Sequence, residues 1–425
     1  MRVFVWMAIL LSFFAQQARA GDGKRSEPGV RLAAAFQFPQ IPGLSGPSAD
    51  WRQWDSFLTF VVKRFAQDVP AGVQDLLGEA FLDSRYELTS AIAPGKGGNP
   101  VPELFLNAWQ RLSPIMKNAM AGMSKQTGTQ YASFIGATDK LASVGRQGAQ
   151  LGLLQLSPDA LRGVASLIEP SAAADPLAYS TAVDSALRSL LGFGAPLAAV
   201  EGRRGRFVQR FLPEVQKASV VAPWLGALAS EPASPVNTLN QWVPDDKGLQ
   251  AYLMEVRSLL VESSDRVAAK NKLAEEYKAI YRQIVFAAAW QESCWRQFVK
   301  QGANIATLAS ATGDLGLMQV NRNTWRGVYD LQELGGDIQY NTSAGGEILL
   351  HYLARYAVRR GEDKQPGGNL ARATYSAYNG GPGQLGRYRA ANVNPALRKV
   401  DEAFWQKFQT VSVGHEMDVK SCYQK

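Results

Sequence analysis

Apolar residues in this chain recur at helical spacing, and no alternating strand pattern of useful length interrupts them in its first half. The clearest case follows Asp50, a possible N-cap. The apolar side chains that would share one face of this helix are Trp51, Trp54, Leu58, Val61 and Phe65. An aromatic stripe of this kind is more typical of a packed core than of a sugar-binding platform. The first half of the chain is therefore predicted to be all-α.

Further helices are predicted at 102–123, 159–168 and 182–191, and turn-forming segments such as 94–100 separate them. No internal repeat of fixed period is present. A chain of 425 residues exceeds the usual size of one domain, which favours two. The Pro- and Ser-containing segment 230–235 is the predicted linker, and the domain boundary is predicted near residue 240.

The predicted domains are a helical domain at 49–240 and a second domain at 241–425. The sequence of the first domain assigns it no chemistry. It is a possible binding surface for protein partners.

The N-terminus has the pattern of a secretory signal: a basic start at Arg2, an apolar run over 3–14 and Ala18-Arg19-Ala20 before Gly21. The apolar run is shorter than the roughly 20 residues that span a bilayer, which favours cleavage over the alternative of a membrane anchor. We predict that residues 1–20 are removed.

Residues 21–48 contain Pro, Gly and Ser without periodicity, which predicts a flexible leader. No later stretch is apolar for long enough to cross a bilayer, so we expect no stable membrane insertion. The mature protein is predicted to be periplasmic or secreted.

The net charge of +8 predicts attraction to anionic polymers. In an exported protein these would be carboxylates and phosphates of the cell wall or outer surface, and we do not predict nucleic acid as a partner. A basic surface that only confers solubility is the alternative. The arginine cluster at 203–210 has the same two interpretations, anionic glycan or a solvated helix face.

Cys294 and Cys422 are the only cysteines, an even number in a chain bound for an oxidising compartment. We predict that they form a disulfide, with a reactive thiol at Cys294 as the competing idea. The two histidines, His351 and His415, fit neither a Cys/His zinc spacing nor a Ser-His-Asp set. A carboxylate calcium site is harder to exclude, although no EF-hand loop is present. No metal or cofactor is predicted.

A long helical pattern over 265–291 is followed by Glu292. A carboxylate at a helix C-terminus faces the negative end of the helix dipole, and desolvation by Trp290, Trp295 or a bound sugar would disfavour its anion further. Both effects would raise the pKa of Glu292 from about 4.3 toward ~6, where a carboxyl can act as a general acid. Taken alone, Glu292 could equally be a surface glutamate.

Two later segments offer groups that could bind a ligand. In 313–320, Gly316 permits close backbone approach, Met318 is a soft apolar surface, and Gln319 supplies a donor and an acceptor; a buried turn is the alternative. A helix over 370–381 ends in Gly-Gly-Pro, which leaves Tyr378 and Asn379 at a terminus. A second helix, predicted to be capped by Asn341-Thr342, is interpreted as scaffold.

Together the three segments resemble a known family. Glu292-Ser293, Gly316-Leu317-Met318-Gln319 and Ala377-Tyr378-Asn379, in this order, are similar to the signatures of the soluble lytic transglycosylase domain, which is related to goose-type lysozymes. The resemblance covers roughly residues 275–395. It implies a mainly α protein with a lysozyme-like catalytic domain at the C-terminus, preceded by the all-α domain. The spacing from Glu292 to Gly316 is somewhat long for the family, and Gly380 replaces a frequent alanine.

The resemblance also implies roles for single residues. Glu292 would be the acid/base, Ser293 would orient it or the substrate, and Tyr378 would lie near the acid and the reacting sugar. The groups that would line the sugar subsites are Gln319, the backbone of Gly316, Leu317 and Met318, and Asn379. The substrate would be peptidoglycan, cleaved between MurNAc and GlcNAc, with the 6-hydroxyl of the muramic acid closing a 1,6-anhydro ring.

Two alternatives remain open. Goose-type lysozymes resemble this chain around Gly-Leu-Met-Gln-Val but place an aspartate next, where this chain has Asn321. An amide cannot act as a general base, which favours the transglycosylase, although the nearby Asp314 could substitute in a hydrolase. A non-catalytic peptidoglycan-binding protein is the other alternative, against which the acid at Glu292 argues.

Overall fold

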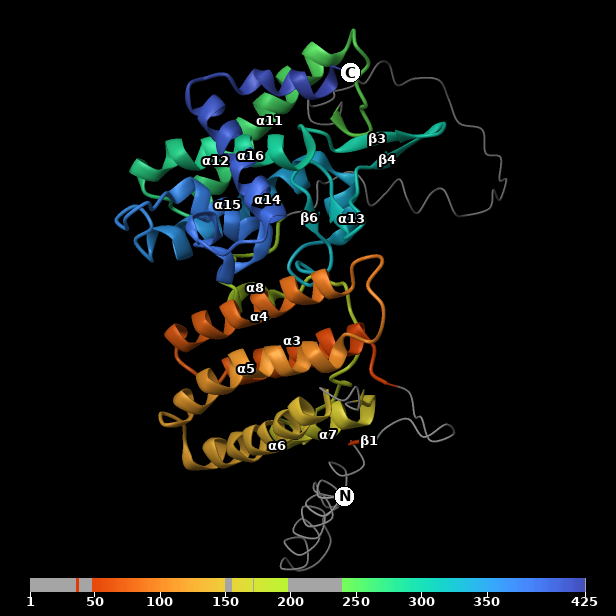
Figure 1. Ribbon diagram of the computed structural model, residues 1–425, viewed down its shortest axis with the longest axis vertical. Helices are drawn as coiled ribbons and strands as arrows, with labels where there is room; N and C mark the ends of the chain where they lie inside the picture. The colour runs from red at the N-terminus through yellow and green to blue at the C-terminus, as the bar shows by residue number, and fades with distance from the viewer. Residues whose placement is uncertain (1–35, 38–47, 150–154, 171, 198–238, 425) are drawn as a thin grey trace, which may run out of the picture. The chain divides into compact units, whose positions relative to one another are not determined.

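The residues that the computed structural model describes are 36–37, 48–149, 155–170, 172–197 and 239–424. The chain divides into two compact units, which we call the N-terminal unit (1–192) and the C-terminal unit (193–425). Both are built mainly from helices (Figure 1), so the predicted mainly α fold is confirmed.

Several predictions concern residues outside the described ones: the signal at 1–20, most of the leader at 21–48, the linker at 230–235 and the arginines at 203–210. They stay predictions. Within the predicted leader, β1 (Phe36–Gln37) pairs antiparallel with β2 (Gln155–Leu156), so this short piece has a defined partner.

The units divide between Gly192 and Phe193, earlier than the domain boundary predicted near residue 240. The reason lies in Phe193, whose ring stacks on His351 at 4.8 Å and meets the edge of Trp325 at 5.7 Å. Phe193 therefore belongs to the core of the C-terminal unit. Because residues 198–238 are not described, the predicted boundary itself stays a prediction.

The described helices of the N-terminal unit are α3 (Trp51–Ala66), α4 (Ala71–Ala91), α5 (Val101–Met120), α6 (Lys125–Ala149), α7 (Pro158–Ile168) and α8 (Ser185–Leu190). Helix α3 begins as predicted: Asp50 accepts hydrogen bonds from the backbone N–H groups of Arg52 and Gln53, and the Gln53 side chain completes a capping box. The helices α3, α5 and α6 bury their apolar faces against one another (Figure 1).

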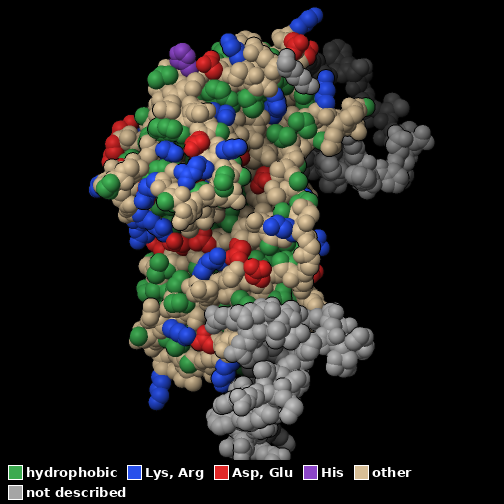
Figure 2. All heavy atoms as spheres, viewed as in Figure 1, with side chains coloured by type: hydrophobic (Ala, Val, Ile, Leu, Met, Phe, Trp, Pro, Cys, Tyr) green, Lys and Arg blue, Asp and Glu red, His purple; other side chains and the backbone are tan. Residues whose placement is uncertain are grey.

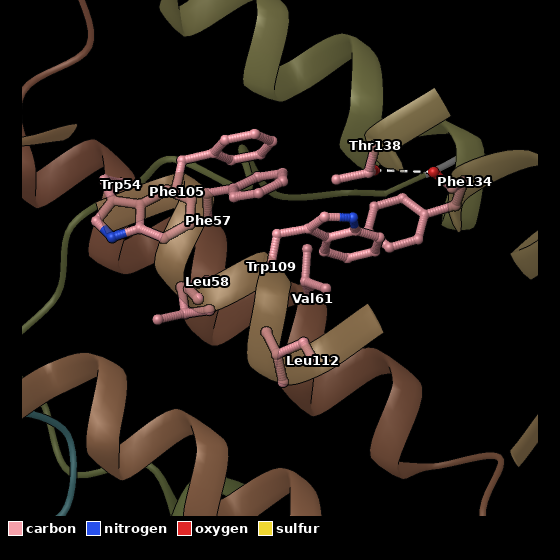
Figure 3. Close-up of a pocket in the computed structure, with 10 residues that line it drawn as sticks. Trp54, Phe57, Leu58, Val61, Phe105, Trp109, Leu112, Phe134 and Thr138 are labelled. Atoms are coloured by element: carbon pink, nitrogen blue, oxygen red, sulfur yellow. Dashed lines mark hydrogen bonds between the residues drawn. The ribbon is translucent and has the colours of Figure 1, made fainter. Parts of the chain in front are cut away.

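The predicted aromatic stripe of α3 is mostly core. Trp54, Leu58 and Val61 line a small apolar cavity between α3, α5 and α6, together with the rings of Phe105 and Trp109 (Figure 3). The cavity has about 10 Å³ of free volume, which is the room that a single water molecule needs. It is a packing defect of this core and has no space for a ligand.

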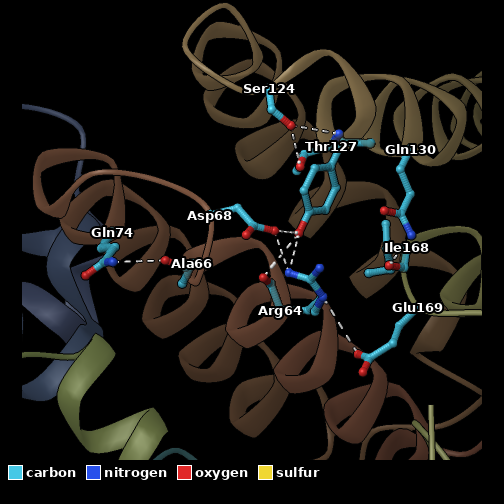
Figure 4. Close-up of polar contacts among 10 residues, drawn as sticks. Arg64, Ala66, Asp68, Gln74, Ser124, Thr127, Gln130, Ile168 and Glu169 are labelled. Atoms are coloured by element: carbon cyan, nitrogen blue, oxygen red, sulfur yellow. Dashed lines mark hydrogen bonds and ion pairs between the residues drawn. The ribbon is translucent and has the colours of Figure 1, made fainter. Parts of the chain in front are cut away.

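Several charged groups in the N-terminal unit form ion pairs. Asp55 and Arg85 are both buried, and the Arg85 Nε donates to Asp55 Oδ1 at 2.9 Å. Near the surface, the Arg64 guanidinium donates to Asp68 at 2.5 Å and lies 3.9 Å from Glu169 (Figure 4). These contacts stabilise the helix packing.

The C-terminal unit contains the longer list of elements: α11 (Leu249–Lys270), α12 (Glu275–Ser293), β3 (Phe298–Gln301), β4 (Asn304–Thr307), β5 (Asp314–Leu315), β6 (Val320–Asn321), α13 (Leu331–Gly336), α14 (Ile338–His351), the π-helix η1 (Tyr352–Val358), α15 (Leu370–Gly380), the 3-10 turns η2 (Pro382–Gln384) and η3 (Arg387–Arg389), α16 (Pro395–Ser412) and η4 (Glu416–Tyr423). The short hairpins β3–β4 and β5–β6 were not predicted.

Two helix predictions were wrong. The single helix over 265–291 is two helices, because Lys272 has a positive φ of 52° and turns the chain between α11 and α12. Helix α14 is capped by Asp337, not by Asn341 and Thr342, which lie buried inside its first turns.

Helix α12 lies in the centre of the C-terminal unit and packs against α11, α14, α15 and α16. Residues 284–290 of this helix are all buried, and the small side chains of Ala287, Ala288 and Ala289 allow neighbouring helices to approach. Neighbouring helices therefore surround the end of α12, where Glu292 lies. Among the described residues, no helix is both long and apolar enough to span a membrane.

The predicted disulfide is confirmed. Cys294 and Cys422 are bonded, with their Cα atoms 6.1 Å apart and a separation of 128 positions in sequence. The Arg296 guanidinium donates to the Cys422 carbonyl at 3.0 Å, and the Tyr423 hydroxyl donates to the Cys294 carbonyl at 2.9 Å. The end of the chain is thereby tied to the end of α12.

Candidate active site

Glu292 lies in the last turn of α12, and the chain turns sharply behind it. Cys294 and Trp295 have φ angles of 53° and 62°, so two successive non-glycine residues adopt the left-handed region. The Trp295 ring is fully buried and meets the edge of Phe286 at 5.5 Å. This turn ends the helix and leaves Glu292 partly exposed on its last turn.

One tyrosine holds the Glu292 carboxyl. The Tyr375 hydroxyl donates to Glu292 Oε1 at 2.8 Å. The Tyr375 ring is 1% exposed and stacks on Phe404, with centroids 4.0 Å apart and planes 2° from parallel. Because α15 and α16 clamp the ring, the direction of this hydrogen bond is fixed.

The surroundings of Glu292 favour its neutral form. Desolvation by burial is the largest effect and raises the pKa of the Glu292 carboxyl to about 7, and the charge of Asp314 acts in the same direction. The hydrogen bond from Tyr375 and the charge of Lys407 lower it. The shift has the predicted direction, and desolvation is one of the two causes that were predicted for it.

Lys407 is the cation whose charge acts on Glu292. Lys407 on α16 donates to Gln291 Oε1 at 2.8 Å, and no ion pair joins it to Glu292 in the described part of the chain. Burial lowers the pKa of the Lys407 ammonium, and the Glu292 charge raises it. Glu292 therefore receives its one direct side-chain hydrogen bond in this part of the chain from a neutral group.

The turn 316–319 depends on a residue that sequence reasoning missed. The side-chain oxygen of buried Gln297 accepts from the Leu317 N–H at 2.7 Å, and its amide donates to the carbonyls of Leu334 and Gly335 at 3.1 Å. Gly316 has a φ of +70°, and a Cβ there would lie 2.2 Å from the Gln297 oxygen. Glycine is therefore required at 316 so that Gln297 can reach the turn.

The four residues of this turn do not all face the solvent. Leu317 and Met318 are completely buried, and the Met318 N–H donates to Asn341 Oδ1 at 2.8 Å. Gln319 is partly exposed, and its amide donates back to the Gly316 carbonyl at 2.7 Å. Of the side chains predicted to bind sugar here, only that of Gln319 lies at the surface.

Ser293 is buried, and in the described part of the chain its hydroxyl forms no hydrogen bond with the Glu292 carboxyl. Its hydroxyl lies 2.6 Å from the Leu317 carbonyl and 3.2 Å from the Ala289 carbonyl, and it accepts from the Arg296 N–H at 3.1 Å. Ser293 thus joins the end of α12 to the 316–319 turn. The structure places it as a support of the site and not at its surface.

The motif at 377–379 is joined by a hydrogen bond to the motif at 316–319. The Tyr378 hydroxyl donates to the Met318 carbonyl at 2.5 Å, and Asn379 Oδ1 accepts from the Arg387 guanidinium at 3.1 Å. The contact with the acid belongs to Tyr375, which precedes Tyr378 by one helical turn and shares its face. That spacing was the available signal for Tyr375.

The structure therefore brings the three sequence motifs together, and comparison with known families agrees. Residues 270–400 match the family described as the transglycosylase SLT domain. This part of the chain is a transglycosylase SLT domain. Members of this family are peptidoglycan lytic transglycosylases, so the match points to lytic transglycosylase activity on peptidoglycan. Comparisons with curated proteins and with solved structures found no match.

The match covers under a third of the chain and ends within α16. Phe404 and Lys407, which support the site, lie beyond it. The replacement of alanine by Gly380 has a local reason in this SLT domain. A Cβ at 380 would lie 2.7 Å from the Arg387 guanidinium, which forms a buried ion pair with Asp401 at 2.7 Å.

Asn321 forms a hydrogen bond with Asp314, the carboxylate whose charge acts on Glu292. Its amide donates to Asp314 Oδ1 at 2.8 Å across the β5–β6 pair, and its oxygen caps the following turn through the N–H groups of Asn323 and Thr324. The other oxygen of Asp314 accepts from the hydroxyls of Ser310 and Thr312. Both carboxylate oxygens of Asp314 therefore already accept hydrogen bonds.

Proposed function

We propose that this protein is an exported lytic transglycosylase that cleaves the bond between MurNAc and GlcNAc in peptidoglycan, with Glu292 as its single acid/base. The observation that carries the proposal is the state of Glu292. Its pKa is raised to about 7, it is held by the neutral Tyr375, and it lies in an SLT domain beside the 316–319 turn.

In the first step Glu292 acts as the acid. Since Tyr375 donates to Oε1, the proton is expected on Oε2, from which it passes to the glycosidic oxygen. The bond from that oxygen to the muramic acid C1 breaks, and positive charge develops at C1. A carboxyl with a pKa near 7 is substantially protonated at neutral pH, as this step requires.

In the second step the Glu292 carboxylate acts as the base. It takes the proton of the muramic acid 6-hydroxyl while the 6-oxygen bonds to C1. The product is a 1,6-anhydro sugar, and Glu292 is protonated again without water being consumed. Enzymes that use the substrate's own group in this way need no second carboxylate.

Hydrolysis is the second candidate, because the charge of Asp314 acts on Glu292. Hydrogen bonds from Asn321, Ser310 and Thr312 occupy three of the roughly four acceptor sites of the Asp314 carboxylate, which leaves little capacity to take a proton from water. The amide of Asn321 cannot replace it as a base. These contacts favour the transglycosylase.

Export is part of the proposal. It is supported by the signal pattern over residues 1–20 and by the disulfide between Cys294 and Cys422, a bond typical of oxidising compartments. We place the mature protein in the periplasm or outside the cell. The role of the N-terminal unit, including binding to protein partners, stays a prediction.

Mass analysis of products from purified sacculi tests the chemistry. The mature protein is expected to release muropeptides that end in anhydromuramic acid, each lighter by one water than a hydrolytic product. Products that carry only the added water would assign the reaction to the hydrolase, and Asp314→Asn would then be the next variant to measure.

A further inference from the structure

Arg372 on α15 is an unusual arginine of the C-terminal unit. Its guanidinium lies between two aromatic rings, 5.0 Å from the centroid of Tyr388 and 5.6 Å from that of Trp405. The side chain is partly exposed, yet its Nε is buried and has no hydrogen-bond partner in the structure as described. A buried N–H group without an acceptor lowers the stability of the fold by about 1–3 kcal/mol, so packing alone does not account for this arginine.

Neighbouring arginines have carboxylate partners. Arg387 pairs with Asp401 at 2.7 Å, and Arg389 pairs with Glu362 at 2.5 Å. Within the described residues Arg372 forms no ion pair with any carboxylate. Because the Nε is buried, a carboxylate would bind the two terminal nitrogens of the planar guanidinium, whose position the contacts with Tyr388 and Trp405 restrict.

Arg372 lies close to the catalytic acid. It precedes Tyr375, the hydrogen-bond donor to Glu292, by three residues, or about 4.5 Å along the axis of α15. On α16, Trp405 directly follows Phe404, which stacks on Tyr375. The cluster of Arg372, Tyr388 and Trp405, which we call the arginine clamp, is therefore a neighbour of the active site.

The substrate offers a matching group. The muramic acid of peptidoglycan carries, through its lactyl group, a short peptide with free carboxylates. An extended peptide spans about 3.5 Å per residue, so a stem of three residues reaches roughly 10 Å from the sugar. Lys and Arg side chains are also gathered in one region of the face of the C-terminal unit that Figure 2 shows, which favours an anionic ligand.

We propose that the arginine clamp binds a carboxylate of the acidic stem peptide and so makes the enzyme prefer charged stems. This inference rests on the proposed function. The Arg372 guanidinium donates to the carboxylate, and the partly exposed Trp405 ring packs against the peptide beside it. Because no Arg372 contact reaches Glu292, Arg372 sets specificity and takes no part in the proton transfers.

The test compares two substrates that differ only in charge: glycan strands with free stem-peptide carboxylates, and the same strands with these groups converted to carboxamides. The wild-type enzyme is expected to have roughly tenfold higher kcat/KM on the acidic strands, as one charge-assisted contact provides. Arg372→Gln should lower kcat/KM on acidic strands to the amidated level and leave amidated strands unaffected.

Arg282→Gln is the matched control. It removes the same charge from α12, where Arg282 forms an exposed pair with Asp265 of α11, and it should keep the wild-type preference. Equal losses on both strands in Arg372→Gln would mean that the clamp only packs the fold, and would overturn the proposal. So would an unchanged preference.

Binding separates this proposal from the proposed function. In a Glu292→Gln background, which binds without turnover, acidic strands should bind roughly tenfold more tightly than amidated strands, and adding Arg372→Gln should remove the difference. If the wild type cleaves neither strand, the proposed function fails, while this binding comparison still decides the role of Arg372. Equal binding of both strands before Arg372 is changed overturns the clamp.

Discussion

In the N-terminal unit the carboxylate of Asp55 is 1% exposed and pairs with the equally buried Arg85, whereas in the C-terminal unit the carboxyl of Glu292 receives its hydrogen bond from neutral Tyr375. A cation partner keeps a buried carboxylate charged and makes it part of the fold. At Glu292, desolvation raises the pKa and outweighs the hydrogen bond from Tyr375, which favours the anion. The comparison shows how the same functional group, a carboxyl, has a buried cation as its partner in one unit and a raised pKa in the other.

Removal of the acid should have the largest effect. Glu292→Gln is expected to lower the rate of muropeptide release from sacculi by about 10²–10⁴-fold, because the amide cannot donate an acidic proton or accept one. Glu276→Gln, on the exposed first turn of the same helix, is the matched control and should keep full activity. Turnover by Glu292→Gln close to the wild-type rate would disprove the assignment.

The same substitution should make the protein more stable at high pH. The pKa of Glu292 is raised to about 7 in the fold, above its ordinary 4.5, so the fold binds the proton more tightly than the unfolded chain does. This stabilisation is complete below pH 4.5 and is lost as the pH rises through about 7. The melting temperature of Glu292→Gln relative to wild type is therefore expected to be higher at pH 8 than at pH 4.5.

Removal of the buried carboxylate of Asp55 should lower the stability of the protein. Asp55→Ala leaves Arg85 buried without its partner and is expected to lower the free energy of unfolding by about 3–5 kcal/mol, measured by urea denaturation. Asp159→Ala, which breaks an exposed pair with Arg162, should change it by less than about 1 kcal/mol. Equal changes in both variants would contradict the distinction between structural and surface pairs.

The disulfide is a covalent tie that only the C-terminal unit has among the described residues. Replacing Cys294 and Cys422 together by serine should lower the free energy of unfolding by about 2–4 kcal/mol, since the bond closes a long loop. Melting curves of wild type with and without reductant should show the same loss. If neither treatment changes the melting temperature, the bond has no structural role.

The smallest expected effect concerns the neutral donor. Cleavage should decline as the pH rises through about 7, where Glu292 loses its proton. Tyr375→Phe removes a hydrogen bond that favours the anion, so the decline should move to higher pH, and kcat should fall roughly tenfold as the carboxyl loses its fixed direction. Tyr277→Phe, earlier on α12, is the control. An unmoved pH profile would mean that Tyr375 only packs the fold.

Local sequence signals were sufficient for several features of this protein. Helix periodicity and a capping residue predicted α3 from Asp50 onward, and Gly-Gly-Pro predicted the end of α15. Three ordered motifs led to the SLT domain, and the number of cysteines led to the disulfide. Each of these predictions depends on short runs of consecutive residues, on the order of such runs or on the number of cysteines. All of these can be read from a single sequence.

Other features depend on contacts between distant segments, and only the tertiary structure decided them. Tyr375, and not Tyr378, bonds to Glu292, because Phe404 on another helix fixes its ring. Gln297 and Gly316 were coupled by a contact that no spacing rule describes. The pKa of a carboxyl follows from every group packed around it, so the sequence could single out Glu292, while burial, Tyr375, Asp314 and Lys407 together set its raised pKa.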